Sequence, residues 1–371
     1  MPPNVGVQFH AMWEDYDVAT RTAVFDKLAA AKVGWVRVDL GWSSFEERGR
    51  GVLSQWYVDR ADAVVDQAAA RGIKVLGMLW ATPGWANGGG GSAVPPSDPG
   101  DYARFARWAA EHFRGRVSAW EVWNEPNDRY FWAADAARYA ALVRAAYPSF
   151  KAGDPAALVV AGSTVHNDDG WLAAAYDAGM GGFFDVLSTH PYMAPTNAPP
   201  DLADDGTIWR MDHVRAVRAL MVARGDGAKP IWFTEFGWSS HANLPGMPNW
   251  KLGVTESEQA DYLVKALAQM AGQYPYVTNA FWYNERSKAT GDPQEDNLGL
   301  LRRDLTEKPA YQALRSALSA ARPPTSTTTT AVTASTTTST TTTAVAASTT
   351  TSTPRKQPRA AKWSWLRLFG W

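Results

Sequence analysis

The chain has 371 residues, of which 46% are hydrophobic, so it is long enough to bury a large core. Its net charge of −1 argues against a general nucleic-acid binder, and the absence of cysteine excludes thiol catalysis, disulfides and cysteine-based metal sites. No apolar run reaches the roughly 18 residues of a membrane span, and no secretory signal is visible after Met1.

Strand and helix patterns alternate along the first part of the chain. Apolar runs of strand length are expected at residues 5–10, 35–42, 74–80, 117–123, 158–164, 185–192, 231–238 and 277–283. Amphipathic helices are expected after them, at residues 19–32, 55–71, 101–113, 134–151, 171–178, 211–224, 256–273 and 309–318.

Eight such units favour an α/β fold closed into a (β/α)8 TIM barrel, for which about 250 residues plus loop insertions is typical. An open doubly wound sheet is the alternative. That fold carries a Gly-rich dinucleotide-binding turn after its first strand, but His10-Ala11-Met12-Trp13 stands there instead. The pattern therefore favours the barrel.

Two of the predicted strands have a glutamate at or just beyond their C-terminal part. Glu125 follows the fourth strand within Trp-Asn-Glu-Pro, and Glu235 ends the seventh within Thr-Glu-Phe-Gly-Trp. Because the active sites of such barrels lie at the C-terminal ends of the strands, both side chains should face one rim. Glycoside hydrolysis needs such a pair, an acid and a base or nucleophile. For either glutamate alone, a solvated residue at a strand end is the alternative.

The chain has 19 tryptophans, many of them at predicted strand ends and in the loops that follow. At such places flat apolar faces could stack on sugar rings. These residues are Trp42, Trp80, Trp85, Trp123, Trp238, Trp250 and Trp282. Core packing is the alternative, and we expect it for Trp35, Trp108 and Trp232.

The two glutamate motifs together resemble the signature of clan A of the glycoside hydrolases, an Asn-Glu-Pro after strand four and a Glu that ends strand seven. The resemblance covers residues 5–318 in element order. Weaker matches are Arg37 on strand two, the run from Ser188 to Tyr192, and Trp282 on strand eight. The run from Leu298 to Tyr311 is similar to the last-loop motif of family thirty-nine and its bacterial exopolysaccharide-hydrolysing relatives.

The resemblance implies a retaining glycosidase that acts on a polysaccharide or oligosaccharide, with carboxyl groups about 5–5.5 Å apart and a covalent glycosyl-enzyme. Glu125 would be the acid and then the base, and Glu235 the nucleophile. No cofactor is implied. A non-catalytic carbohydrate-binding barrel at the cell surface is the alternative, but a binder has no need of two like charges held together.

The same resemblance assigns roles to the neighbouring polar residues. Asn124 would hydrogen-bond the sugar 2-hydroxyl. Arg37 and Tyr192 would keep Glu235 ionised and aligned, since a nearby cation or a hydrogen-bond donor favours a charged carboxylate. His190 would contact either the sugar or Glu235.

His10 and the tryptophans complete the predicted substrate-binding set. His10 ends strand one on the same rim, although a buried, hydrogen-bonded histidine is an equal alternative. Asp39 is either the ion-pair partner of Arg37 or a substrate contact. No metal is predicted, because a metal-dependent barrel hydrolase often has His-x-His after strand one, and Gln8 occupies that place. The aromatic members of the set are Trp80, Trp238 and Trp282.

Composition divides the chain into a catalytic domain at residues 1–322, a Thr/Ser/Ala-rich linker at 323–354 and a basic aromatic segment at 355–371. The linker is expected to be disordered. The last segment suits an anionic membrane surface or a cell-wall polymer, with an inert terminus as the alternative. Such linkers are common in extracellular carbohydrate enzymes, so we expect a secreted or envelope-associated monomer.

Overall fold

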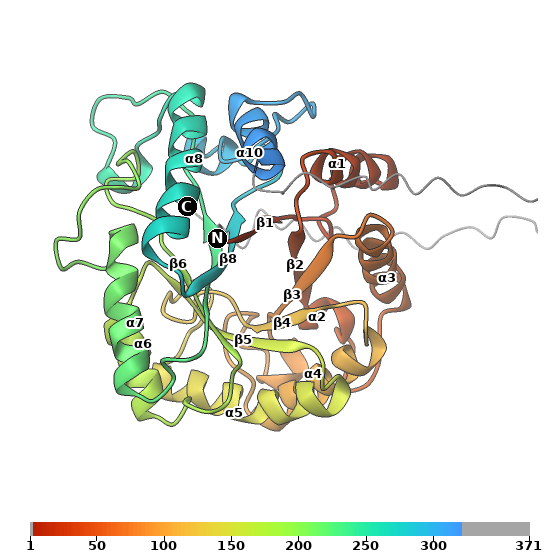
Figure 1. The fold of residues 1–371 in the computed structure, drawn as a ribbon. Coiled ribbons are helices and arrows are strands. Elements are labelled where there is room, and N and C mark those ends of the chain that lie inside the picture. The colour runs from red at the N-terminus through yellow and green to blue at the C-terminus, as the bar shows by residue number, and fades with distance from the viewer. Residues whose placement is uncertain (1–2, 321–371) are drawn as a thin grey trace, which may run out of the picture. The chain divides into compact units, whose positions relative to one another are not determined.

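The computed structural model describes residues 3–320, which lie within the compact unit Met1–Arg322. Eight parallel strands form a closed barrel in chain order, and helices surround it (Figure 1). The strands are β1 (Asn4–Gln8), β2 (Trp35–Gly41), β3 (Lys74–Trp80), β4 (Ala119–Val122), β5 (Leu158–Val165), β6 (Val186–His190), β7 (Ile231–Phe236) and β8 (Val277–Trp282). The predicted (β/α)8 barrel is confirmed.

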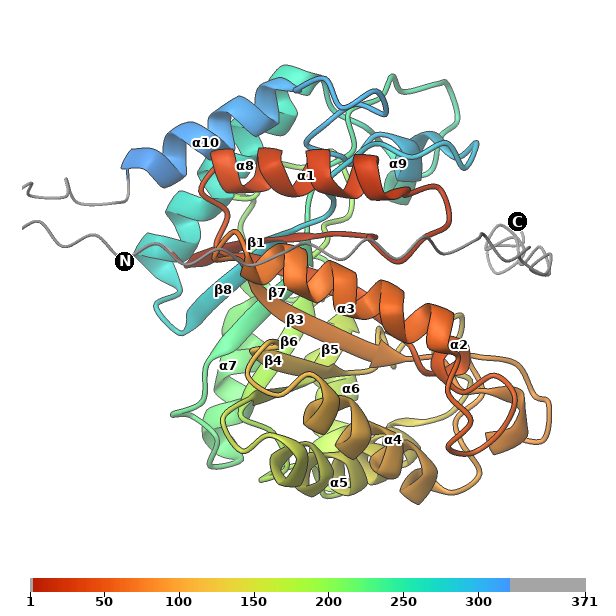
Figure 2. The same ribbon diagram turned by 90° about the vertical axis from the view of Figure 1, so that its right-hand side faces the viewer.

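A helix follows each strand and lies along the outside of the barrel (Figure 2). These helices are α1 (Val18–Ala30), α3 (Gln55–Ala69), α4 (Pro99–His112), α5 (Ala136–Gly153), α6 (Asp169–Asp177), α7 (Val214–Ala223), α8 (Glu256–Gln273) and α10 (Pro309–Ala320). Local sequence fixes their starts. The side chain of Asp17 accepts from the amide of Thr20 at α1, and Thr255 and Glu258 form a capping box at α8.

Short helices in the connecting loops go beyond the predicted alternation. They are α2 (Trp42–Phe45), α9 (Pro293–Asp296) and the 3-10 helices η1 (Gly84–Ala86), η2 (Met211–His213) and η3 (Asn249–Lys251). None of the described helices is both long and apolar enough to cross a bilayer. The predicted linker and the basic aromatic segment lie outside the described residues.

The hydrophobic core has two parts. The larger part fills the space between the strands and the outer helices. The smaller part closes the interior of the barrel and consists of Trp35, Leu76, Ala119, Val160, Val186, Trp232 and Phe281. Packing here is tight, since a Cβ on Gly6 would lie 2.3 Å from the ring of Phe281.

Side chains alternate in direction along a strand, so the inward positions after this apolar layer are two residues further on. Arg37 follows Trp35 in this way, and Glu121 follows Ala119. Both are fully buried. The barrel interior therefore changes from apolar to charged towards the C-terminal ends of its strands.

Strand β4 ends earlier than the sequence predicts, at Val122 instead of residue 123. Trp123 and Glu125 both have left-handed backbone, with φ of 71° and 41°. This backbone departs from the extended conformation of a strand, and non-glycine residues are held there only when their surroundings require it. The chain thus leaves the sheet where the Asn-Glu-Pro motif begins.

Candidate active site

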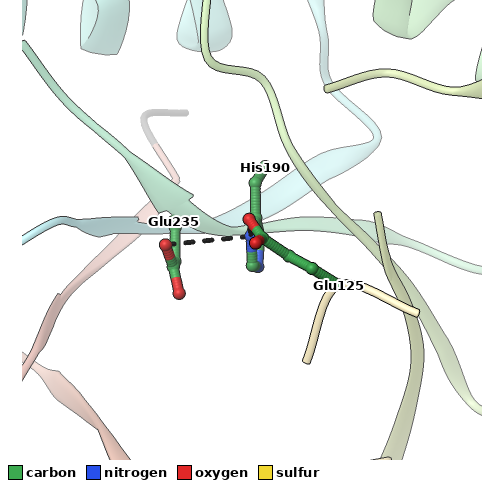
Figure 3. Close-up of side chains that lie close together, drawn as sticks. All are labelled: Glu125, His190 and Glu235. Carbon is green, nitrogen blue, oxygen red and sulfur yellow. Dashed lines mark hydrogen bonds and ion pairs between the residues drawn. The ribbon is translucent and has the colours of Figure 1, made fainter. Parts of the chain in front are cut away.

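Glu125 and Glu235 meet at the C-terminal end of the barrel. Glu125 follows β4 and Glu235 lies on β7, and one carboxylate oxygen of each lies within 4.8 Å of the other and of a ring nitrogen of His190 (Figure 3). Both glutamate side chains are 10% exposed and that of His190 is fully buried. Two residues far apart in sequence therefore form one largely buried acidic pair.

Arg37 lies beneath this pair and is fully buried. Its Nε donates to Glu121 at 2.5 Å, and its Nη1 donates to Glu235 at 2.6 Å and to Gln8 at 2.8 Å. Its Nη2 donates to Asn124 at 2.7 Å. The guanidinium thus fixes the acceptor groups on β1, β4 and β7 relative to one another.

The Glu235 carboxylate receives a hydrogen bond on each oxygen. Arg37 donates to Oε1, and the Tyr192 hydroxyl donates to Oε2 at 2.9 Å. Burial alone would raise the pKa of Glu235, but the charges of His190 and Arg37 and the hydrogen bond from Tyr192 outweigh it and hold this pKa below its usual value. Glu235 is therefore ionised near neutral pH.

Glu125 experiences the opposite balance. Burial raises the pKa of Glu125, and the contact with His190 and the negative charge of Glu235 act against each other without reversing that shift. His190 Nδ1 lies 2.8 Å from Glu125 Oε1, and His190 Nε2 lies 3.0 Å from the Thr234 hydroxyl, which fixes the ring orientation. The pair thus has one member suited to hold a proton and one suited to hold a charge.

Asn124 is oriented by its contact with Arg37. Because the amide oxygen accepts from Arg37 Nη2, the amide nitrogen is the group left to donate elsewhere. Asn124 is 5% exposed and directly precedes Glu125. A donor is therefore available beside the acidic pair, as the prediction for the sugar 2-hydroxyl requires.

The structure brings together most of the predicted site. Arg37, His190 and Tyr192 all contact one of the two glutamates. His190 lies 2.8 Å from Glu125 and 3.8 Å from Glu235. The predicted contact of His190 with Glu235 is therefore present, and the shorter contact with Glu125 was not predicted.

His10 corresponds to the buried alternative. It is 4% exposed, its Nδ1 lies 2.6 Å from Asp39, and its ring stacks on Trp13 with centroids 3.9 Å apart. Asp39 also accepts from Gln8 at 2.8 Å. Asp39 was expected to pair with Arg37 or to contact substrate, but the carboxylates that accept hydrogen bonds from Arg37 are Glu121 and Glu235.

The three predicted tryptophans are placed differently from one another. Trp80, partly buried at the end of β3, packs against Phe131 with ring centroids 5.9 Å apart. Trp238 is 2% exposed and Trp282 is 0% exposed, and their indole N–H groups donate to backbone carbonyls at 2.8 and 3.1 Å. These two are core residues without an accessible face, so the prediction that they contact the sugar is wrong.

Sequence reasoning missed the polar residues beneath the pair. Glu121 is fully buried and accepts from the hydroxyls of Ser163 at 2.7 Å and Ser188 at 3.0 Å, besides Arg37. A charged residue at an inward position of a buried strand was the available signal.

A cation could also be considered at this place. Glu125, His190 and Glu235 are the group of potential ligands that converges among residues 3–320. Glu235 already accepts from Arg37 and Tyr192, His190 contacts Thr234, and Glu125 contacts His190. These contacts suit a carboxylate pair that acts on its own.

Comparison with known proteins identifies the family. A family model described as cellulase (glycosyl hydrolase family 5) matches residues 4–287. The chain belongs to glycoside hydrolase family 5. Family 5 is part of clan A, the clan whose signature the two glutamate motifs resemble. None of the curated proteins compared with the chain matches it.

Solved structures of two families are similar to this family 5 chain. A family 39 glycoside hydrolase from the gut symbiont Bacteroides cellulosilyticus WH2 is 27% identical with a TM-score of 0.70, covering 86% of this chain and 64% of that one. The GH39 enzyme from Xanthomonas axonopodis pv. citri is 21% identical with a TM-score of 0.63, covering 84% and 65%. The chain thus spans less than two thirds of the length of these two relatives.

GH5_18 from Streptomyces cattleya, solved in complex with GlcNAc, is 18% identical with a TM-score of 0.65, covering 87% of this chain and 82% of that one. At this identity the likeness concerns the fold. The expected similarity to family 39 thus accompanies membership of family 5.

Proposed function

We propose that this family 5 glycosidase cleaves O-glycosidic bonds of a polysaccharide or oligosaccharide by double displacement, with Glu125 as acid and base and Glu235 as nucleophile. One observation carries the assignment. The two carboxylates lie within 4.8 Å of each other, and their surroundings shift the pKa of Glu125 up and the pKa of Glu235 down. Paired groups whose pKa values are pushed apart in this way typically take the acid and the anionic role.

In the first step, the ionised Glu235 attacks the anomeric carbon while Glu125 gives its proton to the leaving oxygen. A glycosyl ester of Glu235 forms and the leaving sugar departs as an alcohol. In the second step, Glu125 takes a proton from water, whose oxygen attacks the anomeric carbon and releases Glu235. Both carboxyl groups return to their starting states.

The surrounding residues support each step. Arg37 and Tyr192 hold Glu235 ionised and aligned before attack. His190 orients Glu125. Asn124 donates to the sugar 2-hydroxyl, a hydrogen bond that strengthens as the transition state forms.

Glu235→Gln tests the nucleophile. The amide cannot form the ester, so hydrolysis of an activated aryl glycoside should fall by about 10⁴-fold or more. Glu47→Gln is the matched control, because Glu47 is exposed. Activity of Glu235→Gln within a few fold of the wild type would remove the assignment.

Glu125→Ala tests the acid and base. We expect a loss of about 10²- to 10⁴-fold on substrates with poor leaving groups and a smaller loss on activated ones. Azide should restore turnover and give a glycosyl azide of retained configuration. Without azide rescue or leaving-group dependence, the role of Glu125 would be wrong. A wild-type chain that binds glycans but hydrolyses none would favour the carbohydrate-binding alternative.

Two further expectations remain proposals. We propose that the protein acts outside the cell or at the cell envelope, in keeping with the Thr/Ser-rich composition of residues 323–354. Contact with the envelope through residues 355–371 is a proposal on composition alone.

A further inference from the structure

Trp209 combines a fixed backbone with an exposed ring. It lies in the loop between β6 and α7, and its side chain is 46% exposed. Its carbonyl accepts from the amide of Ala194 at 3.3 Å. Asn167 holds both neighbours, since its amide donates to Ile208 at 3.2 Å and its side chain donates to Arg210 at 2.8 Å. A large apolar ring is thus presented to solvent on an anchored segment.

A short series of contacts connects Trp209 with the acid. The ring of Trp209 meets that of His166 with centroids 6.5 Å apart. His166, just after β5, donates from Nδ1 to the carbonyl of Tyr192 at 2.7 Å and forms an isolated backbone bridge with His190. His190 in turn lies 2.8 Å from Glu125. Trp209 is therefore on the side of the rim formed by β4, β5 and β6.

The proposed mechanism makes that side the leaving-group side. The acid protonates the leaving oxygen, whereas the nucleophile attacks the opposite face of the anomeric carbon. The sugar that departs therefore lies next to Glu125, and the sugar that is transferred lies over Glu235. Trp209 is on the side of Glu125.

We propose that Trp209 is a stacking platform for a sugar beyond the scissile bond, so that the preferred substrate is a glycan chain that extends on the leaving-group side. This inference rests on the proposed function and deepens it. The carbon-bound hydrogens of a sugar ring present an apolar face, and covering an exposed indole removes apolar surface from water. Aromatic side chains are common in ligand sites for this reason.

Two kinds of substrate separate this subsite from the catalytic centre. A β-glycosyl fluoride carries no sugar beyond the bond that breaks, whereas a β-1,4-linked tetrasaccharide does. We would assay the fluoride and the tetrasaccharide of mannose, of glucose and of xylose, using the full chain. In Trp209→Ala, kcat/KM for the tetrasaccharide should fall about 10- to 100-fold, whereas kcat/KM for the fluoride should stay within about threefold of the wild type. Trp209→Phe should recover most of the loss, because it keeps an aromatic face.

Trp56→Ala is the matched control. Trp56 is 63% exposed on α3, on the outer ring of helices, so it matches Trp209 in residue type and exposure. It should change neither activity. Equal losses of Trp209→Ala on the fluoride and the tetrasaccharide, or no loss on either, would overturn the subsite and leave the glycosidase function intact. A wild-type chain that hydrolyses no glycosyl fluoride would refute the proposed function and the subsite with it.

Discussion

Glu121→Gln removes a buried negative charge that does not touch the cleft. Glu121 is fully buried and shares Arg37 with Glu235. In the variant, the amide oxygen can still accept from Arg37 Nε, and the new NH₂ group can donate to the Ser163 and Ser188 hydroxyls, which then donate to each other or to the carbonyl of Ala161. What is lost is the negative charge that pairs with the buried guanidinium.

The magnitude follows from the contacts. Breaking a buried ion pair by removing one partner costs about 3–5 kcal/mol. Arg37 keeps Glu235, Gln8 and Asn124 as acceptors, and Glu235 still pairs with its charge, so the loss should lie near the lower limit. We expect the free energy of unfolding to fall by about 3 kcal/mol.

Urea unfolding at neutral pH, followed by tryptophan fluorescence, measures this change. The transition midpoint should fall with an unchanged slope, which indicates that the same surface is exposed on unfolding. Glu47→Gln, at an exposed position, should stay within about 0.5 kcal/mol of the wild type. If the free energy of unfolding of Glu121→Gln fell by less than about 1 kcal/mol, the buried Arg37–Glu121 ion pair would not be important for stability, and this reasoning would be refuted.

Further predictions concern pH, substrate contact and packing. Burial raises the pKa of Glu125, whereas His190 and Arg37 outweigh burial and lower the pKa of Glu235. Because Glu235 must be ionised and Glu125 protonated, kcat/KM should fall as the pH drops through the pKa of Glu235 and as the pH rises through the pKa of Glu125. Asn124→Ala should lose about 100-fold in kcat on the natural glycoside but little on its 2-deoxy analogue, measured side by side. Gly6→Ala should destabilise the fold by about 1–3 kcal/mol in urea unfolding, because its Cβ would meet the nearby Phe281 ring at 2.3 Å.

Most of the fold could be predicted from sequence patterns. Apolar runs of strand length alternate with amphipathic helices, and each predicted unit has its counterpart in the barrel. The ends of elements were less accurate. The predicted helix at residues 211–224 begins as the 3-10 helix η2, and the strand before Glu125 stops at Val122. Such ends depend on tertiary contacts and on single left-handed residues, which apolar periodicity does not encode.

The site was predictable only where a motif pointed to it. Glu125 and Glu235 ended their strands, and barrel topology required both ends to lie on one rim. The burial of Trp238 and Trp282 was not predictable in the same way. A strand-end tryptophan can face the rim or the helices, and the loops that follow decide which side is covered.

The different states of the two glutamates depend on residues outside the recognised motifs. Burial acts on both carboxyl groups and would by itself raise both pKa values. The difference arises because Arg37 and Tyr192 donate to Glu235, whereas the hydrogen-bonding partner of Glu125 is His190. Arg37 in turn is held by Glu121, so a carboxylate that never touches substrate helps to keep Glu235 charged. The catalytic asymmetry of the pair therefore originates in the polar layer below it.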